Sequence, residues 1–406
     1  MSVRLTEQQA ALIEQVRRFA LRDIVPFERE SETDKAYAQK LLAKLGGAQL
    51  LGLNIPEEYG GVGLSHLEAA MCVEEMGRHN LDAAGFMAAA SVGQAYYIYA
   101  FGSEAHRRKY LPDICAGKYS VAIGITEPNA GTASTALTTR IRTVGDKLVI
   151  NGRKHYVSNA PNSGLFIIYG RISDAPRAKG IGAVLLDRDT PGFSIDRLSE
   201  NMAGHFQADL LFEDCSVPAS NLLVGESGFA ALTHCYNLER CGGTALILGT
   251  AIGAYDRALD HVGVREQFGR SLVDFQAVQL KLADMAIQIQ AARLMLYHAL
   301  SGETEWPDPT ESSMVKVFGN EAAKQVCDTS IQLMGGAGYL RESGVERRYR
   351  YVRGYSIAGG PLDIHRTMIA GWLTGRRFSQ WAPGNEPATA APTIAVQPQS
   401  IKETTS

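Results

Sequence analysis

The sequence of 406 residues predicts an α+β protein in which an all-β unit is inserted between two helical regions. Apolar residues recur at helical spacing before about residue 120, short β-like runs follow, and helical spacing returns after Gly228. The length also predicts two or three domains at about 150 residues per domain. The expected division is an N-terminal helical domain at 1–120, a β domain at 121–230, a C-terminal helical domain at 231–382 and a disordered tail at 383–406.

The N-terminal region contains two capping boxes, a pattern that marks helix starts. They are formed by Thr6 with Gln9 and by Ser65 with Glu68. The second box predicts a helix that continues to Gly77, and a further helix is expected over 88–101. The stretch 54–63 is rich in Gly and Pro and is expected to be a loop.

The β region contains a strong hairpin pattern, in which Asn151-Gly152 separates the runs 147–150 and 155–158. Asn-Gly favours a type I′ turn because both residues adopt positive φ. Further strands are expected over 165–169, 181–186 and 209–212.

The C-terminal region contains the clearest helix, from Gln276 to Leu300. Its apolar residues alternate in steps of four and three, as along the seam of an antiparallel bundle. They are Val278, Leu282, Met285, Ile289, Ala292 and Leu296. The tail from Pro383 has no apolar periodicity, so we expect it to be disordered.

Composition excludes several classes of function. Lys and Arg number 40 against 43 Asp and Glu, so the net charge of −3 favours neither nucleic acid nor an anionic membrane as a partner. No apolar run reaches the ~18 residues of a membrane span, and the N-terminus lacks the pattern of a signal or transit peptide. Six single cysteines without a C-x-x-C pair argue against zinc or disulfide scaffolds, and they suggest a reducing cytoplasm.

Motifs of other enzyme classes are also missing. The sequence has no P-loop, H-E-x-x-H or dinucleotide-binding glycine pattern, and Gly354-Tyr-Ser356-Ile-Ala358 is one residue short of a nucleophile elbow. Four arginines lie close together at 347, 348, 350 and 353. Because Glu342 and Glu346 are neighbours, we interpret them as a solvated helix face rather than a nucleic-acid site.

Three segments stand together in an informative order. They are Ile125-Thr-Glu-Pro-Asn-Ala-Gly-Thr132 with Tyr156-Val-Ser-Asn159; Arg265-Glu-Gln-Phe-Gly269 with Phe275-Gln276; and Gln332-Leu-Met-Gly-Gly-Ala-Gly-Tyr339 with Glu346-Arg-Arg-Tyr349. On a helix–β–helix pattern, this combination resembles the acyl-CoA dehydrogenase family over almost the whole chain up to about residue 380. The resemblance implies a β-barrel-like middle domain, a C-terminal four-helix bundle and FAD as cofactor.

The resemblance also implies roles for individual residues at the flavin nucleotide. The matching positions are Thr126, Thr132, Tyr156, Ser158, Arg265, Phe268, Gln276, Gln332, Gly335 and Gly336. Tyr156 would cover one flavin face, Ser158 would hydrogen-bond near N5, and Arg265 would hold the pyrophosphate by bidentate hydrogen bonds. In the family, the contacts at Gln332 and the glycine loop come from a neighbouring subunit, which implies a homotetramer or dimer.

The family reaction needs a carboxylate to remove an α-proton while a hydride goes from the β-carbon to flavin N5. Most members carry this base in a loop similar to Ile-Tyr-Glu-Gly-Thr, but this chain has Ile357-Ala-Gly-Gly-Pro361. Gly359 therefore stands at the position of the usual base, where only its backbone N–H is available as a donor. In isovaleryl-CoA and long-chain members the base lies on a helix immediately before an Arg, which matches Glu239 and Arg240.

We therefore predict an FAD-dependent dehydrogenase that converts an acyl thioester to the α,β-enoyl thioester, with Glu239 as base and Arg240 near the substrate. Electrons would leave through an electron-transfer flavoprotein or a similar acceptor, and no metal is expected. Ala133 replaces a common family Asp, so a carrier-protein thioester is an alternative to acyl-CoA. Two other functions stay open: a desulfinating elimination from a β-substituted propionyl-CoA, and a redox-silent subunit that binds a thioester or a partner.

Overall fold

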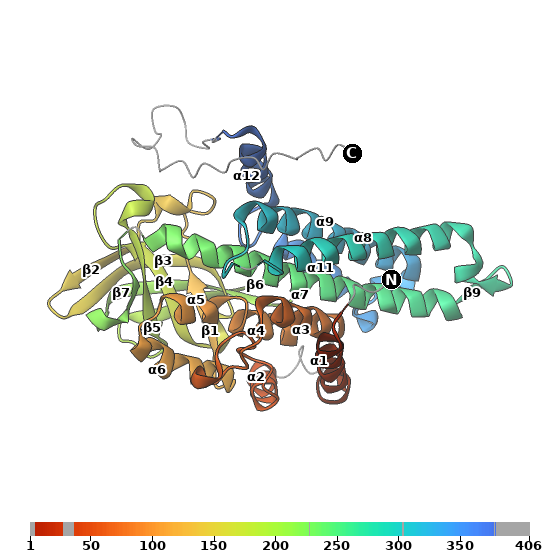
Figure 1. Cartoon of the computed structure of the whole chain (residues 1–406), viewed down its shortest axis with the longest axis horizontal. Coiled ribbons are helices and arrows are strands. Elements are labelled where there is room, and N and C mark those ends of the chain that lie inside the picture. Colours follow the sequence, from red (N-terminus) through yellow and green to blue (C-terminus); the bar gives the residue numbers. More distant parts are fainter. Residues whose placement is uncertain (1–4, 27–35, 227, 303, 377, 379–406) are drawn as a thin grey trace, which may run out of the picture.

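The computed structural model describes residues 5–26, 36–226, 228–302, 304–376 and 378, so the predicted disordered tail at 383–406 lies outside the described residues. Figure 1 shows an elongated molecule with the β strands at one end and a helical bundle that extends to the other. The N-terminal helices lie along one side of the bundle. The predicted three-part fold of helices, β sheet and helices is confirmed.

The N-terminal part is helical as predicted. Its helices are α1 (Glu7–Phe19), α2 (Tyr37–Gly47), α3 (His66–His79), α4 (Leu81–Ala90), α5 (Gln94–Phe101) and α6 (Glu104–Cys115). Both capping boxes form, at Thr6 and at Ser65. The helix expected over 88–101 is instead the end of α4 and all of α5, and the chain breaks helical geometry at Gly93. Because of this break, α5 takes a new direction and packs against the long helix that follows the sheet, α7 (Gly228–Val264).

The middle part forms one mixed sheet within the described residues, with the order β6-β7-β3-β2-β4-β5-β8. Most pairs are antiparallel, and β1 joins the sheet parallel to β4. The strands are β1 (Ser120–Gly124), β2 (Arg140–Val144), β3 (Lys147–Ser158), β4 (Ser163–Arg171), β5 (Ile181–Asp187), β6 (Phe193–Glu200), β7 (Phe206–Pro218) and β8 (Leu222–Val224).

The predicted hairpin at Asn151-Gly152 is wrong, because both residues lie inside the continuous strand β3. The turn between β2 and β3 falls at Gly145-Asp146, so that Val144 pairs with Lys147. At Gly152 the register of β3 against β7 shifts, and φ is +144°. Asn151 uses its side chain to pair with Asp214 on β7. The same two residues that favour a tight turn therefore form a β-bulge here.

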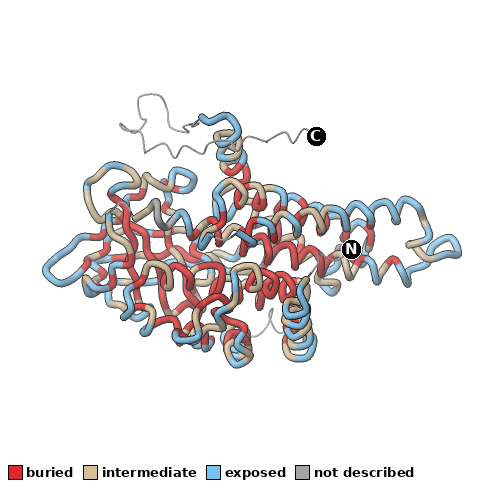
Figure 2. Tube along the Cα trace, viewed as in Figure 1, coloured by how far each residue is buried: buried red, intermediate tan, exposed pale blue. Residues whose placement is uncertain are grey.

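The C-terminal part is a bundle around α7 (Gly228–Val264), α8 (Gln276–Leu300) and α9 (Pro309–Met334). Its remaining elements are β9 (Glu266–Gln267), β10 (Arg270–Ser271), α10 (Gly336–Tyr339), α11 (Val345–Tyr355) and α12 (Leu362–Thr374). Helix α8 has the predicted bounds, and its seam residues Leu282, Met285, Ile289, Ala292 and Leu296 are buried. Figure 2 shows buried segments running from the sheet into this bundle.

The arginine run does not form the solvated face that the sequence suggested. Arg348 is 1% exposed and donates to the carbonyls of Gly77, His79 and Thr250, so it connects α3, α7 and α11. Arg347 pairs with Asp82 of α4. The acidic neighbours in the sequence gave no sign of these partners, because backbone carbonyls and a distant carboxylate bind the two guanidinium groups.

Candidate active site

Glu239 lies on the fourth turn of α7, where α5 packs against this helix. The Tyr97 hydroxyl donates to Glu239 Oε2 at 2.9 Å, and Gln94 Nε2 donates to Oε1 at 3.4 Å. Burial raises the pKa of Glu239, and the Tyr97 hydrogen bond and the cations of Lys316 and Arg240 oppose this shift only in part. The arrangement therefore holds a carboxylate that accepts protons more readily than an exposed one.

The loop after α11 is held from inside by two buried basic side chains. Lys316 of α9 donates to the carbonyls of Tyr355 (3.0 Å) and Ala358 (2.7 Å), and the His365 ring lies 3.2 Å from the Gly359 carbonyl. Burial lowers the pKa of Lys316 to about 8 and that of His365 to about 4. These contacts fix the loop in one conformation.

Gly359 has φ +67°, and a Cβ built on it would lie 3.4 Å from Lys316 Nζ. The same ammonium group lowers the pKa of Glu239, so one side chain lies close to both candidate base positions. Neither Gly359 nor Gly360 uses its N–H in a hydrogen bond within the described part of the chain. Sequence reasoning missed Lys316, because a single lysine in a helix carries no local signal of burial.

Arg240 follows Glu239 on the same helix. It donates from Nη1 to Asn237 at 2.7 Å, while its Nε is buried without a hydrogen-bond partner. Its guanidinium carbon lies 5.9 Å from the centre of the Tyr236 ring. Burial lowers the pKa of Arg240, while the charge of Glu239 opposes this shift.

The flavin candidates of the β domain lie around one anchored loop. The backbone carbonyl of Thr126 accepts from the backbone N–H of His155, and Tyr156 is 66% exposed with φ +57°. Thr132 and Ser158 are also exposed. An aromatic side chain exposed from left-handed backbone is unusual in a strand, and such strain is typical of ligand sites. These residues fit a group that covers them.

A buried ion pair anchors this loop. Lys154 Nζ donates to Glu127 Oε1 (2.7 Å) and to the Ile125 carbonyl (3.0 Å), and the two side chains are 0% and 2% exposed. Glu127 also accepts from Thr138 and Thr139. Glu127 stands inside the quoted Thr-Glu-Pro motif, but the sequence did not show that its role is internal.

The remaining nucleotide candidates lie at the far end of the bundle. Arg265, Phe268 and Gln276 surround the β9–β10 hairpin at the end opposite the sheet in Figure 1. Gln332, Gly335 and Gly336 lie at the α9–α10 junction, whose following loop meets Arg257 near the end of α7. All six are exposed, and Phe268 is 94% exposed. One chain therefore does not bring these residues together with Thr126, Tyr156 and Ser158.

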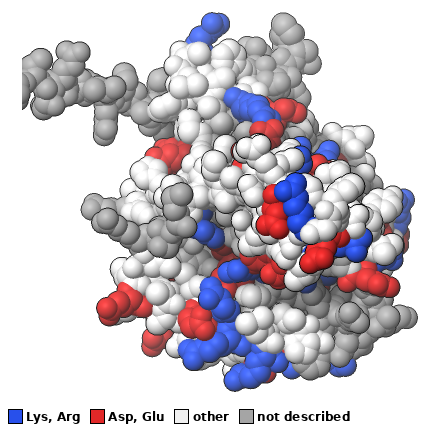
Figure 3. Space-filling view, turned by 90° about the vertical axis from the view of Figure 1, so that its right-hand side faces the viewer, with Lys and Arg blue, Asp and Glu red and all other residues white. Residues whose placement is uncertain are grey.

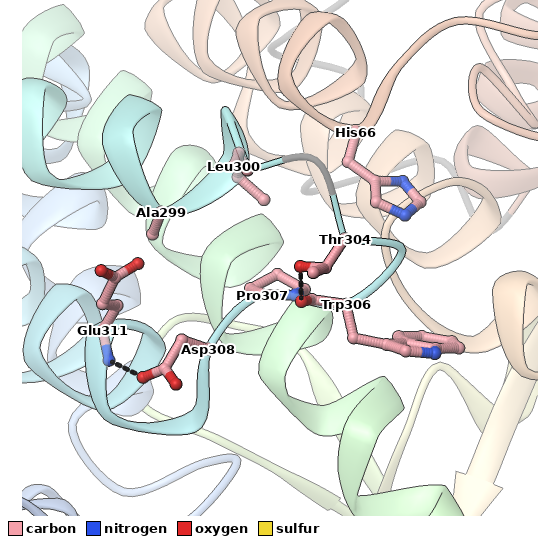
Figure 4. A pocket seen from close by; sticks show the side chains of 9 residues that line it. His66, Ala299, Leu300, Thr304, Trp306, Pro307, Asp308 and Glu311 are labelled. Atoms are coloured by element: carbon pink, nitrogen blue, oxygen red, sulfur yellow. Dashed lines mark hydrogen bonds between the residues drawn. The ribbon is translucent and has the colours of Figure 1, made fainter. Parts of the chain in front are cut away.

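A small hollow of about 90 Å³ lies apart from Glu239, where the α8–α9 connection meets α3. Figure 4 shows His66, Leu300, Thr304, Trp306 and other residues around it. The residues that bond to Glu239 do not line this hollow, so we do not assign the reaction to it.

Family models match the three parts of the chain in order. They describe the acyl-CoA dehydrogenase N-terminal domain (residues 6–118), middle domain (122–215) and C-terminal domain (226–374). The chain belongs to the acyl-CoA dehydrogenase family, whose members are flavoprotein oxidoreductases. The family predicted from the sequence, its fold and the enzyme class are thereby confirmed.

Among its relatives is the 3-sulfinopropanoyl-CoA desulfinase of Paraburkholderia xenovorans, 34% identical over 93% of this chain and 98% of the relative. The human mitochondrial short-chain specific acyl-CoA dehydrogenase is 32% identical over 92% and 91%. The structure of butyryl-CoA dehydrogenase from Megasphaera elsdenii has a TM-score of 0.85 at 29% identity and covers 92% of this chain and 100% of its own.

Two further similarities concern partners. The prolyl acyl carrier protein oxidase AnaB has a TM-score of 0.84 at 28% identity, with 91% of this chain and 100% of AnaB covered. The caffeyl-CoA reductase–Etf complex subunit CarC of Acetobacterium woodii is 32% identical over 85% of this chain and 92% of CarC.

Proposed function

We propose that this chain oxidises an acyl thioester to the α,β-enoyl thioester, with Glu239 as the base. The observation that carries the proposal is a partly buried carboxylate held by Tyr97 beside a loop whose usual base position is glycine. The α-proton passes to Glu239, a hydride leaves the β-carbon, and the Cα=Cβ bond forms. FAD, when bound, supplies the acceptor for that hydride.

The loop at Gly359 supplies the second requirement of this chemistry. Removing an α-proton places negative charge on the thioester oxygen, which must be stabilised by fixed donors. The free N–H groups of Gly359 and Gly360 are such donors, because Lys316 and His365 hold the neighbouring carbonyls inward. Arg240 contributes positive charge beside the substrate.

We infer that FAD binds across two copies of the chain, and the separation of the nucleotide candidates within one chain supports this inference. Thr126, Thr132, Tyr156 and Ser158 would hold the flavin end, and Arg265, Phe268, Gln276, Gln332, Gly335 and Gly336 of another copy would hold the nucleotide end. Helix α8 supports this assembly, because it exposes Leu280, Ile287 and Leu294 at seven-residue spacing. Such a stripe is typical of a helix face that packs on another chain. We propose a homotetramer or dimer.

We also propose an acyl-CoA or acyl-carrier-protein thioester as substrate and an electron-transfer flavoprotein or similar acceptor as electron partner. The named relatives support both thioester classes and an Etf-associated relative supports the acceptor.

Figure 3 shows basic and acidic side chains side by side on the end of the bundle, which does not favour nucleic acid on that face. No described helix is long and apolar enough to cross a membrane. A cytoplasmic location and the domain boundaries remain predictions.

The second candidate function is desulfinating elimination. The glycine at 359 favours it, because elimination without net oxidation has less need of a base, and a relative carries that activity in its name. Glu239 favours oxidation. Anaerobic mixing with butyryl-CoA and, separately, with 3-sulfinopropanoyl-CoA distinguishes them. Oxidation bleaches the flavin absorbance, whereas desulfination breaks the C–S bond, places a proton on that carbon, releases the sulfur dioxide group as sulfite after hydration by water, and leaves the flavin oxidised.

Glu239→Gln tests the role of the base. The amide keeps the shape of the side chain but does not accept a proton, so we expect flavin reduction to slow by about 10²–10⁴-fold with FAD content unchanged. The matched control is Asp260→Asn, an exposed carboxylate on the same helix, which should reduce flavin at the normal rate. Full activity of Glu239→Gln would remove Glu239 from the mechanism, and a chain that takes up no FAD would support a redox-silent subunit.

A further inference from the structure

The side chains around Glu239 limit the length of acyl group that fits beside it. This inference rests on the proposed function. If the α-carbon lies at the Glu239 carboxylate, the rest of the acyl chain passes the residues that flank this carboxylate on α5 and α7. The nearest are large. Tyr97 of α5 is 0% exposed, and its ring meets the Tyr236 ring of α7 edge-on, with 6.1 Å between centroids and an interplanar angle of 88°.

Tyr236 is fixed on the same face of α7 as the catalytic candidate, since it precedes Glu239 by three residues and Arg240 by four. The Arg240 guanidinium lies over its ring. Tyr97 is fixed by its bond to Glu239. The two rings therefore form a wall between α5 and α7, and the Tyr97 hydroxyl in this wall is hydrogen-bonded to Glu239.

The space behind this wall is also filled. Cys235 of α7 is 1% exposed, and Tyr169 of β4 is 0% exposed with its hydroxyl unpartnered. A second group of rings continues outward, because Trp306 stacks on Phe101 and meets Tyr96 edge-on. Trp306 borders the hollow of Figure 4, which is lined by none of Tyr97, Tyr169 and Tyr236 and so does not extend the site.

A long apolar chain would have to displace these rings, and overpacking of a filled interior is unfavourable. We propose that Tyr97 and Tyr236 restrict the substrate to short acyl thioesters, admitting a butyryl group and excluding an octanoyl group.

The experiment measures binding and reaction separately. In the Glu239→Gln background, which prevents turnover, calorimetry gives the Kd of butyryl-CoA and of octanoyl-CoA. With Glu239 present, stopped-flow measures anaerobic flavin reduction by both. We expect butyryl-CoA to bind more tightly and to react faster. Tyr236→Ala opens the wall and leaves the Tyr97–Glu239 bond in place, so it should improve octanoyl-CoA relative to butyryl-CoA by about tenfold or more.

Tyr236→Phe is the matched control, because it keeps the ring and should keep the preference for butyryl-CoA. Tyr236→Leu replaces the alanine variant if that variant does not fold. Equal or better use of octanoyl-CoA by the unsubstituted protein overturns the length limit and leaves the proposed function intact. An unchanged preference in both Tyr236→Ala and Tyr236→Leu overturns the role of this wall. Binding of butyryl-CoA without flavin reduction, in contrast, overturns the proposed oxidation and leaves the length limit standing.

Discussion

At the scale of single residues, the backbone conformation favours Glu239 over position 359 as the proposed base. Gly359 has a left-handed φ of +67°, a conformation that L side chains rarely adopt. A glutamate there would be strained and would approach the Lys316 ammonium. On α7, by contrast, Glu239 has ordinary helical geometry and a hydroxyl donor at 2.9 Å. We therefore expect Gly359→Glu to restore little activity to Glu239→Gln.

Tyr97 provides a residue-scale prediction about pH. Its hydrogen bond stabilises the ionised form of Glu239 and lowers the pKa that burial has raised. Tyr97→Phe removes this donor, so the pKa of Glu239 should rise further. Because the base acts as a carboxylate, activity increases as pH rises through that pKa. The acidic limb of the kcat/KM profile should then move to higher pH.

Tyr99→Phe is the control for this change, since Tyr99 lies on the same helix and makes no hydrogen bond to Glu239. Its profile should match that of the unsubstituted protein. An unmoved acidic limb in Tyr97→Phe would show that Glu239 is not the group that titrates.

At the scale of elements, sequence patterns predicted structure well where one local signal dominates. Helix α8 has its predicted ends because its apolar seam and packing agree. The hairpin prediction at Asn151-Gly152 failed because positive φ occurs in a β-bulge as well as in a tight turn. The pairing of β3 with β7 selects the bulge. The site followed the same rule. Glu239 was proposed from its motif and stays a prediction, whereas Tyr97, Lys316 and Lys154, which contact the candidate residues, were missed because their partners are distant in the sequence.

The loop that carries Thr126 gives a prediction at this scale. Lys154→Met leaves Glu127 buried without its cation, a loss of about 3–5 kcal/mol for a buried pair. We expect lower FAD retention after dialysis together with a lower Tm. The double variant Lys154→Met with Glu127→Gln removes the uncompensated charge and should recover part of both. Lys147→Met, an exposed lysine on the same strand, is the control. Equal FAD retention in all variants would show that this ion pair does not position the loop.

At the scale of the whole molecule, one partly buried carboxylate connects the three parts of the fold. Asp82 of α4 lies 2.6 Å from His205 Nε2 in the β6–β7 loop and 3.1 Å from Arg347 of α11. The Arg347 charge and the His205 hydrogen bond hold the pKa of Asp82 far below its usual range despite burial. This contact joins the sheet to both helical regions, and so helps to position the loop that carries Thr126 relative to Glu239.

Asp82 predicts how stability depends on pH. A carboxylate with a depressed folded pKa stabilises the fold above its unfolded pKa of about 3.9, and this contribution is lost as pH falls toward the folded value. Asp82→Asn should therefore lower the free energy of unfolding most near neutral pH, with a difference that shrinks below about pH 4. Denaturant unfolding at several pH values measures this. Asp284→Asn, an exposed carboxylate, should show no such trend. A constant difference for Asp82→Asn would mean that packing, not charge, explains its effect.

The separation of the nucleotide candidates gives the last prediction. Ser158→Ala weakens the flavin end of a site and Arg265→Ala weakens its phosphate end, where loss of a buried charge partner costs about 2–5 kcal/mol. If one site takes Ser158 from one chain and Arg265 from another, a hybrid dimer of the two variants contains one intact site and one doubly altered site. Tandem-tag purification of the co-expressed hybrid should then recover about half of the normal FAD content, while each variant alone recovers little. If the hybrid contains no more FAD than either variant alone, Ser158 and Arg265 belong to a site within one chain. That result would contradict the shared site, which is proposed because these residues lie toward opposite ends of the molecule in Figure 1.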